Sequence, residues 1–219
     1  MRAYFFDMDG VLFDSMPRHA IAWEEVMKRH GLPFTARDCY INEGRTGESV
    51  IREAFQNVLG RDATPEEVKT IYAEKSAYYH KLLKTTTPTI SGVAEVLQFV
   101  KECGYQVWVV TGSGMRTLLD SLNNVFPTIF QQDRMITAFD VVKGKPDPEP
   151  YLKAWERSGL RKEQCFVIEN APLGVRSGKA AGLTVYAVNT GILTREDLLQ
   201  AGADQVFDSM TELLDFLRQ

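Results

Sequence analysis

Short apolar runs alternate with helical periodicity along most of the chain, and one long helical stretch interrupts this alternation near the N-terminus. The first apolar run covers residues 3–6 and is followed by Asp7-Met8-Asp9-Gly10. A run of this length that ends on a carboxylate and a glycine indicates a buried strand followed by a turn. Further strands are predicted at residues 105–110, 135–139, 165–168, 184–188 and 205–207.

The long helical stretch follows the first strand directly and spans about seventy residues without a strand pattern. Apolar positions recur at helical spacing within residues 20–30 and 50–59, and a glycine follows each stripe. Residues 64–67, Thr-Pro-Glu-Glu, combine a capping threonine with proline at the first helical position, which predicts another helix start. A polar loop, Asn-Glu-Gly-Arg-Thr-Gly at residues 42–47, separates the first two stripes.

Beyond Thr85-Thr-Thr-Pro88, which has the character of a hinge, the predicted strands alternate with helices. These helices are predicted at residues 93–100, 118–122, 151–158, 172–181 and 211–217. Such alternation is typical of an α/β fold with a doubly wound parallel sheet. We therefore predict a core domain made of residues 1–15 and 86–219, with residues 16–85 inserted as a helical domain.

Composition and charge exclude several classes of function. The chain is 44% hydrophobic and 25% charged, and its net charge of -4 gives no basic field to attract nucleic acid or an anionic membrane. No stretch approaches the length of a membrane span, and acidic residues interrupt the N-terminal apolar run, against a signal peptide. Cys39, Cys103 and Cys165 are odd in number and widely spaced, so we expect reduced thiols that fill the core. A soluble, cytoplasmic monomer is expected.

Four polar clusters follow the predicted strands or lie in the loops after them. Because the carboxyl ends of parallel strands meet at one edge of a sheet, where ligands bind, the clusters should converge. Together they would supply a nucleophile, an acid/base, hydroxyl donors, a cation and oxygen ligands for Mg²⁺, as phosphoryl transfer requires. The clusters are Asp7 with Asp9, Thr111 with Ser113, Lys145, and Glu169 with Asn170.

Each cluster taken alone also has an ordinary structural interpretation. The Asp-x-Asp-Gly segment can be a turn that ends a strand, and Thr111-Gly-Ser-Gly can be a turn with Ser113 as a helix cap. Lys145 can be a solvated loop lysine, and Glu169-Asn170 a turn before a helix. The four clusters in this order, each at a strand end or in its loop, are much harder to assign to chance.

The order of the motifs resembles the haloacid-dehalogenase (HAD) superfamily of phosphatases and phosphomutases. The resemblance covers almost the whole chain, and the helical insertion is similar to the small mobile cap of the β-phosphoglucomutase-like branch. It implies a Rossmann-like core and a small phosphorylated substrate or pyrophosphate as the partner. The motifs that carry it are Asp7-Met-Asp-Gly-Val, Val-Thr111-Gly-Ser, Lys145-Pro and Ile168-Glu169-Asn170.

The resemblance also implies roles for the residues that act on the phosphoryl group. Asp7 resembles the nucleophile that becomes an aspartyl phosphate, and Asp9 resembles the general acid/base. Lys145 looks like the cation at the phosphoryl group. The residues that resemble the phosphate-binding loop are Thr111, Gly112 and Ser113.

A Mg²⁺ site is implied by the same resemblance. Asp7, the backbone carbonyl of Asp9 and Asn170 look like the ligands, with Glu169 in or beside that shell. Many members of the superfamily have aspartate where this chain has Asn170. The change keeps an oxygen ligand but removes a negative charge, so we expect lower metal affinity without loss of the site.

Two residues of the helical insertion, His19 and Lys75, are similar to a histidine and a lysine of β-phosphoglucomutase that serve the acid/base and the substrate. Lys75 stands on an apolar stripe of its helix, and a cationic group there should meet an anionic site at the domain interface. The alternative is a lysine that snorkels past its neighbours and a histidine whose hydrogen bonds are made to the backbone.

The polar loop at residues 42–47 bears on the choice of substrate. Glu43 stands before Gly44 where the mutase has a basic residue, and Gly47 lines up with the arginine that holds a second phosphate; Arg45 lies two residues earlier. Glu43 and Arg45 are predicted to contact the substrate from this loop. The loop is instead similar to that of a bacterial inorganic pyrophosphatase of the same branch. An acidic residue over a small anionic pocket would disfavour bulky or doubly charged organic phosphates.

We therefore predict a Mg²⁺-dependent phosphohydrolase that works through an aspartyl phosphate and cleaves inorganic pyrophosphate. A β-phosphoglucomutase that interconverts glucose 1-phosphate and glucose 6-phosphate, or a small sugar-phosphate phosphatase, is the alternative enzyme. A phospho-accepting module without catalytic activity is a third interpretation. Asp9 argues against this last one, because a module that must keep its phosphate needs no acid/base beside it.

Overall fold

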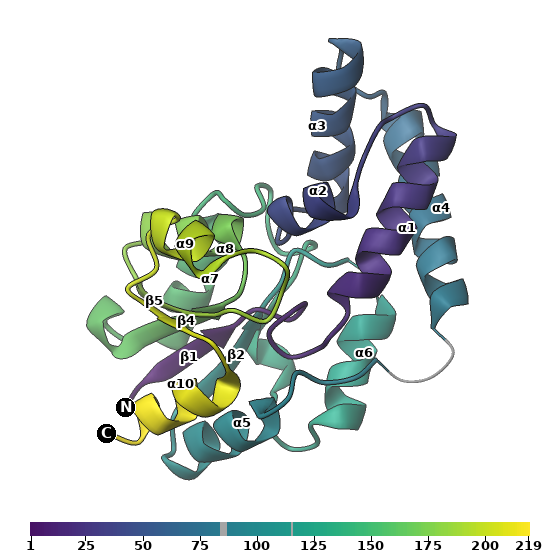
Figure 1. Cartoon of the computed structure of the whole chain (residues 1–219). Coiled ribbons are helices and arrows are strands. Elements are labelled where there is room, and N and C mark those ends of the chain that lie inside the picture. The colour runs from purple at the N-terminus through teal and green to yellow at the C-terminus, as the bar shows by residue number, and fades with distance from the viewer. Residues whose placement is uncertain (84–86, 115) are drawn as a thin grey trace.

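The computed structural model describes residues 1–83, 87–114 and 116–219. Within these residues one sheet of parallel strands forms the centre of the molecule, in the order β3-β2-β1-β4-β5-β6 (Figure 1). This confirms the predicted doubly wound α/β fold. The strands are β1 (Ala3–Phe6), β2 (Gln106–Val110), β3 (Met135–Ile136), β4 (Cys165–Glu169), β5 (Thr184–Val188) and β6 (Gln205–Phe207).

Helices cover both faces of the sheet, as the right-handed crossovers of a parallel sheet require. One face carries α5 (Val93–Glu102), α6 (Arg116–Val125) and α10 (Met210–Leu217). The other carries α7 (Glu149–Ser158), α8 (Pro172–Ala180) and α9 (Arg195–Gln200). Two short 3-10 helices, η1 (Gln132–Arg134) and η2 (Lys162–Gln164), lead into β3 and β4.

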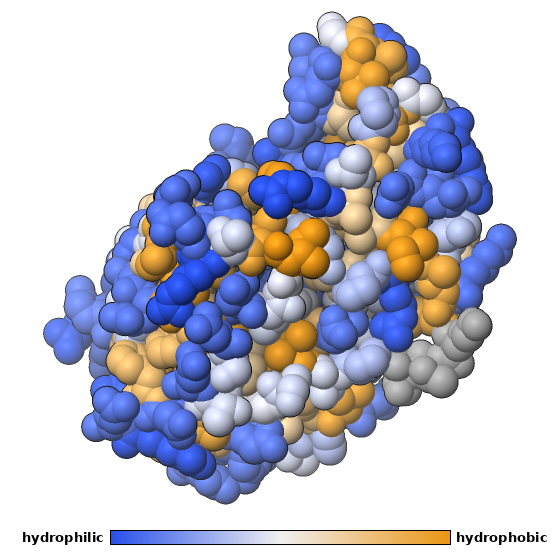
Figure 2. Space-filling model, viewed as in Figure 1, coloured by the Kyte–Doolittle hydropathy of each residue, from blue (hydrophilic) through white to orange (hydrophobic). Residues whose placement is uncertain are grey.

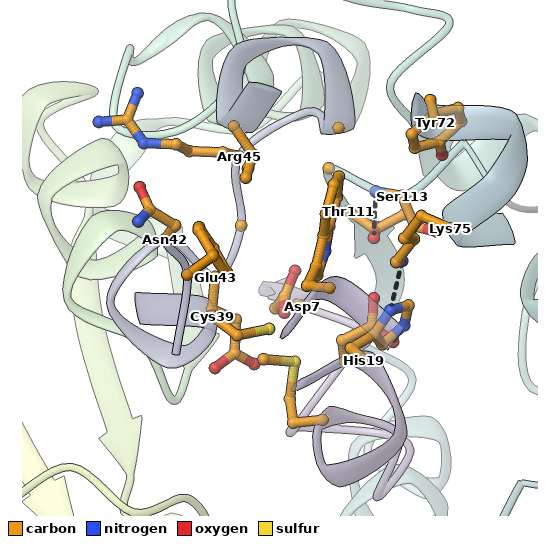
Figure 3. Close-up of a pocket in the computed structure, with 18 residues that line it drawn as sticks. Asp7, His19, Cys39, Asn42, Glu43, Arg45, Tyr72, Lys75, Thr111 and Ser113 are labelled. Atoms are coloured by element: carbon orange, nitrogen blue, oxygen red, sulfur yellow. Dashed lines mark hydrogen bonds and ion pairs between the residues drawn. The ribbon is translucent and has the colours of Figure 1, made fainter. Parts of the chain in front are cut away.

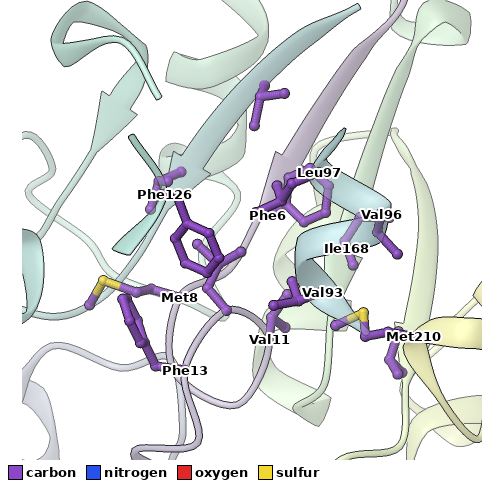
Figure 4. Packing of buried hydrophobic residues seen from close by; sticks show 14 of the residues in the cluster. Phe6, Met8, Val11, Phe13, Val93, Val96, Leu97, Phe126, Ile168 and Met210 are labelled. Atoms are coloured by element: carbon purple, nitrogen blue, oxygen red, sulfur yellow. The ribbon is translucent and has the colours of Figure 1, made fainter. Parts of the chain in front are cut away.

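Strand β1 shows why its sequence is apolar throughout. Tyr4 and Phe6 point to the face covered by α5 and α10, whereas Ala3 and Phe5 point to the face covered by α7 and α8. Figure 4 shows Phe6 packed among side chains of β4 and α5, on the first of these faces. Since both faces are buried, every position of the strand is apolar until the chain leaves the sheet at Asp7.

A helical lobe stands apart from the sheet and has its own apolar core, which includes Trp23, Met27 and Ile51 (Figure 1). The helix start predicted at Thr64 is confirmed, because its hydroxyl accepts a hydrogen bond from the Glu67 backbone N–H, and the Glu67 carboxylate accepts one from the Thr64 N–H. The helices are α1 (Met16–Arg29), α2 (Ala36–Ile41), α3 (Gly47–Leu59) and α4 (Pro65–Leu82).

We call this helical lobe the cap. Its predicted bounds, residues 16 and 85, stay a prediction. Helix α1 begins at Met16, but residue 85 and part of the predicted hinge at 85–88 lie outside the described residues.

Some local predictions were wrong. The strand predicted at 135–139 ends at Ile136, because the Thr137 backbone N–H donates to the Asp140 carboxylate at 2.9 Å and closes a turn. Helix α9, only six residues long, was not predicted. Cys39 and Cys165 are buried as expected, but Cys103 is exposed and so does not fill the core.

The described helices include none with the length and apolar character needed to cross a membrane. In the space-filling view, apolar residues form separate small areas among hydrophilic ones (Figure 2).

Candidate active site

The candidate site lies at the carboxyl end of β1, where neighbouring strands deliver the polar clusters. The Asp7 backbone N–H donates to the Ile168 carbonyl at 3.0 Å, which fixes the end of β1 beside the end of β4. Thr111 follows β2 on the other side of β1. The predicted convergence of residues from distant parts of the chain is therefore what the structure shows.

Lys145 is fully buried and bridges two carboxylates. Its ammonium group donates to Asp7 Oδ1 at 2.6 Å, to Glu169 Oε1 at 2.6 Å and to the Val110 carbonyl at 3.0 Å. Burial alone would lower the pKa of Lys145, but the Asp7 and Glu169 carboxylates raise it to about 12. Lys145 is therefore a buried, permanently charged member of the site and not a solvated loop lysine.

Glu169 is held by contacts on both of its oxygens. Besides Lys145, the Tyr151 hydroxyl donates to Glu169 Oε1 at 2.8 Å, and the Asn170 and Ala171 backbone N–H groups donate to Oε2 at 3.0 and 3.3 Å. A carboxylate with this many donors is best suited to orient Lys145. Its direct binding to a metal stays a prediction.

The surroundings of Asp7 oppose the ionisation of its carboxyl group. Burial raises the pKa of Asp7 to about 8; Lys145 opposes this, while Glu169 and Asp9 add to it. An additional cation beside Asp7 would relieve this repulsion and keep the carboxylate ionised.

Glu43 reaches the core site from the cap. The Asn170 Nδ2 group donates to Glu43 Oε1 at 2.9 Å, and both side chains are buried. Burial raises the pKa of Glu43 well above its ordinary range; Asn170 opposes this, and the nearby Asp7 and Glu169 add to it. The cap thus places another acidic group beside the core carboxylates.

Asn170 uses only part of its hydrogen-bonding capacity. Its Oδ1 atom is buried and has no hydrogen-bond partner within the described part of the chain. No three His, Cys, Asp or Glu side chains among the described residues converge as a metal site, so a metal here would need amide or carbonyl oxygens as well. The free Oδ1 atom and the neighbouring Asp7 carboxylate fit a divalent cation that prefers oxygen ligands.

Asp9 faces the cap helices. Its carboxylate accepts a hydrogen bond from the Ser15 hydroxyl, and Oδ1 lies 3.4 Å from His19 Nε2. Burial would raise the pKa of Asp9, but His19, Ser15 and Lys75 together hold it below the ordinary value. Asp9 is therefore kept ionised in the absence of substrate.

His19 and Lys75 form a buried pair behind Asp9. Lys75 Nζ lies 2.7 Å from His19 Nδ1, as the dashed line in Figure 3 marks. The ammonium group also lies 4.9 Å from the Trp23 ring centroid, and burial lowers the pKa of Lys75 to about 8. Lys75 therefore does not snorkel, and both residues lie at the cap–core interface as the sequence predicted.

A pocket with a cavity volume of about 70 Å³ opens above these residues, with walls from both the core and the cap (Figure 3). The Ser113 backbone N–H donates to Thr111 Oγ1 at 3.0 Å and shapes the loop that contains Gly112. Arg45 also borders the pocket, but its guanidinium group pairs with Glu53 at 2.9 Å. Its role in substrate binding stays a prediction.

Sequence reasoning did not single out Ser15, Tyr72 or Tyr151. Ser15 holds Asp9, Tyr151 holds Glu169, and Tyr72 lines the pocket from α4. Tyr72 lies on the same apolar stripe as Lys75, and this position indicates that Tyr72 faces the core domain. For Ser15 the sequence held no signal, because its contact depends on the turn after β1.

The fold and the pocket define a capped α/β enzyme with a carboxylate at the end of its central strand. The chain belongs to the haloacid dehalogenase-like hydrolases, whose family model matches residues 1–182. It is therefore a phosphatase or phosphotransferase of the HAD type, as the sequence resemblance predicted.

Several known proteins are similar over nearly the whole chain. A phosphorylated carbohydrates phosphatase from Thermotoga maritima is 33% identical, with 93% of this chain and 92% of that protein covered. The β-phosphoglucomutase of Bacillus subtilis is 27% identical over 87% and 84% of the two chains. A solved structure from Bacteroides vulgatus, described as a candidate β-phosphoglucomutase, is 47% identical with a TM-score of 0.94 and covers 100% of this chain and 88% of that chain.

Proposed function

We propose that this protein is a Mg²⁺-dependent phosphohydrolase that cleaves inorganic pyrophosphate through an aspartyl phosphate. The observation that carries the choice of substrate is the Glu43 carboxylate, which the cap buries against Asn170 at 2.9 Å. The proposed catalytic machinery itself lies in the core domain.

In the proposed reaction, an oxygen of Asp7 attacks one phosphorus atom of pyrophosphate and the bridging P–O bond breaks. Asp9 donates a proton to the departing phosphate, so it must pick up that proton as the substrate binds. Asp9 then takes a proton from the water that attacks the aspartyl phosphate, which releases the second phosphate and restores Asp7. In this proposal Lys145, which contacts Asp7 at 2.6 Å, and Thr111, which lines the pocket, stabilise the charge on the transferring group.

The ligands proposed for Mg²⁺ are the Asp7 carboxylate, the Asp9 backbone carbonyl and Asn170 Oδ1. The buried Oδ1 atom without a partner among the described residues supports this assignment. When bound, the metal would neutralise charge on the phosphoryl oxygens and orient the substrate for in-line attack.

Replacement of Asp9 should slow substrates with poor leaving groups most. We expect Asp9→Asn to lower kcat for such substrates by about 10²- to 10⁴-fold, because proton donation to the leaving group is lost. On p-nitrophenyl phosphate, whose leaving group needs little help, the loss should be clearly smaller. Steady-state rates on both kinds of substrate test the role, and equal losses would argue against it.

Glu43 supports a small inorganic substrate for an electrostatic reason. A buried acidic side chain at this place offers no cation to a second phosphate carried on a sugar, but it can form a hydrogen bond with an oxygen of a neighbouring phosphate or with a metal-bound water. Pyrophosphate supplies such an oxygen on its leaving phosphate. The cap would therefore select the substrate while the core performs the chemistry.

Glu43→Gln should remove this preference while sparing simple monoesters. One interaction with a charged group contributes roughly 1.5 to 3 kcal/mol, so the ratio of kcat/KM for pyrophosphate to that for p-nitrophenyl phosphate should fall about ten- to a hundredfold. Glu48→Gln is a matched control, since Glu48 lies on the same cap outside the pocket and pairs with Arg52. A ratio unchanged in Glu43→Gln would remove Glu43 from substrate selection.

A sugar-phosphate phosphatase or a β-phosphoglucomutase is the second candidate function. The names of the similar proteins from Thermotoga maritima and Bacillus subtilis favour it. Against the mutase, the cap loop has Gly47 where the resemblance would place a phosphate-binding arginine, and Arg45 is paired with Glu53.

A substrate panel separates these functions. Pyrophosphate, glucose 1-phosphate, glucose 6-phosphate and a hexitol phosphate are each assayed for phosphate release at one fixed free Mg²⁺ concentration. The proposal requires pyrophosphate to give the highest kcat/KM. Preferred release of phosphate from a sugar or hexitol phosphate would replace it with the sugar-phosphate phosphatase.

We also infer a cytoplasmic location for the enzyme. The three cysteines are unpaired, and two of them are buried, which suits a reducing compartment.

A further inference from the structure

The cap loop, residues 42–47, packs closely against two glycines of the core, Gly112 and Gly144. A Cβ atom added to Gly112 would lie 2.3 Å from the Gly44 carbonyl oxygen and 2.9 Å from the Arg45 carbonyl oxygen. One added to Gly144 would lie 2.9 Å from Thr46 Cγ2. Ordinary contacts of a Cβ atom begin near 3.4 Å. The loop can therefore lie this close to the core only because positions 112 and 144 have no side chain.

We propose that Gly112 is a specificity-determining residue, because its lack of a side chain sets how closely the cap loop and Glu43 approach the phosphoryl site. Gly112 belongs to the loop after β2, next to Thr111, and the cap loop lies directly on it. The position of the cap in the closed enzyme would thus be fixed by a backbone-to-backbone contact.

An alanine at position 112 should disturb the contact with the cap loop without straining the core backbone. Its φ angle is not positive, so an alanine fits the core backbone without strain. The nearest atoms to an added Cβ belong to the cap loop, and they are backbone atoms that no rotamer change can move away. An alanine at position 112 therefore meets its obstacle only when the cap is closed.

The cap loop has little freedom to avoid the added methyl group by sliding. Gly44 has a φ of +90°, and a Cβ there would lie 2.9 Å from Lys145 Cδ, so Lys145 packs against the same turn. The loop must instead lift by about 1 Å, judged from the 2.3 Å contact. A lift of this size would break the 2.9 Å hydrogen bond between Asn170 and Glu43.

Selection of the substrate should weaken as a result. Misplacement of a positioning group by about 1 Å can lower a rate by about 10²-fold. The pocket would also widen, so that larger monoesters lose less than pyrophosphate does. This effect on specificity rests on the proposed function, whereas the effect on cap closure does not.

The accessibility of Cys39 tests cap closure without substrate or metal. Cys39 lines the pocket and is buried, Cys165 is fully buried in the core, and the exposed Cys103 is removed by Cys103→Ser. In this background, alkylation of Cys39 by iodoacetamide is followed by peptide mass spectrometry. Gly112→Ala should raise the rate several-fold over the parent.

Gly114→Ala is the matched control in the same loop. Its φ is not positive, and its added Cβ would lie 3.5 Å from Phe139 and from the Tyr72 hydroxyl, which is ordinary contact. Its alkylation rate should equal that of the parent. If Gly112→Ala matches the parent, or if both alanine variants react equally faster, the contact with the cap loop does not control closure and the proposal fails.

The effect on substrate specificity is measured with the same two variants at fixed free Mg²⁺. In Gly112→Ala the ratio of kcat/KM for pyrophosphate to that for p-nitrophenyl phosphate should fall at least about tenfold. Gly114→Ala should stay within about twofold of wild type. Faster alkylation without a change in this ratio would overturn the specificity role of Gly112. If wild type cleaves p-nitrophenyl phosphate but not pyrophosphate, the proposed substrate is wrong, while the alkylation result still decides whether Gly112 controls closure.

Discussion

Asp7→Asn should lower kcat by at least about three decades while the fold is kept. Asp7 ends the central strand, lines the pocket and has one oxygen held by Lys145 at 2.6 Å. An asparagine can accept the same hydrogen bond, but its amide cannot form the aspartyl phosphate. A loss of this size corresponds to about 4 kcal/mol of transition-state stabilisation.

The stability of the same variant gives an independent check. In the metal-free protein, burial raises the pKa of Asp7 to about 8, above its value in the unfolded chain. For an acid this means that the folded state loses stability as the pH rises from about 4 towards 8. A neutral asparagine avoids that cost but gives up the ion pair with Lys145, so the difference in Tm between the two proteins in chelator should shift in favour of Asp7→Asn as the pH rises from about 4 to 8.

The matched control is Asp14→Asn, the same substitution at an exposed position seven residues later. We expect wild-type kcat for this control. Near-normal turnover in folded Asp7→Asn would exclude the covalent mechanism, because an amide cannot form the aspartyl phosphate.

Removal of the divalent cation should abolish activity. A chelator should reduce turnover to background, Mg²⁺ should restore it, and Ca²⁺ should inhibit because it is larger and tolerates geometries that do not align the phosphoryl group. The reason is the set of oxygen ligands proposed around Asp7 and Asn170. Full activity in chelator would overturn the assignment of the metal.

The role of Asn170 in this site can be measured separately. Asn170→Ala removes the proposed Oδ1 ligand, so the free Mg²⁺ concentration for half-maximal activity should rise at least about tenfold. Asn189→Ala is the control, since Asn189 follows β5 at the same edge of the sheet but outside the pocket. Equal Mg²⁺ requirements in the two variants would contradict the role of Asn170.

Much of the fold and of the core site could be predicted because the signals are local. The run at residues 3–6 is apolar since β1 is buried on both faces, and Asp7 marks the point where it leaves the sheet. Once the strands are known to be parallel, the clusters after β1, β2 and β4 must meet.

The remaining features depend on contacts that no local pattern encodes. The hydrogen bond between Glu43 and Asn170 joins residues 127 positions apart and exists only because the cap lies on the core. The early end of β3 reflects competition between the sheet and the Asp140 side chain for the Thr137 backbone N–H. The pairing of Lys145 with Glu169 likewise needed the folded chain, because a loop lysine is usually solvated.

The central claim, that this HAD enzyme prefers pyrophosphate to a sugar phosphate, is tested most directly by internal competition. Pyrophosphate and glucose 1-phosphate at equal concentration share one reaction with wild-type enzyme and fixed free Mg²⁺, and ³¹P NMR follows both. The ratio of the two initial rates then equals the ratio of their kcat/KM values, whatever the amount of active enzyme. We expect pyrophosphate to be consumed at least about tenfold faster. Faster loss of glucose 1-phosphate, or its conversion to glucose 6-phosphate when a sugar bisphosphate is added, would contradict the account.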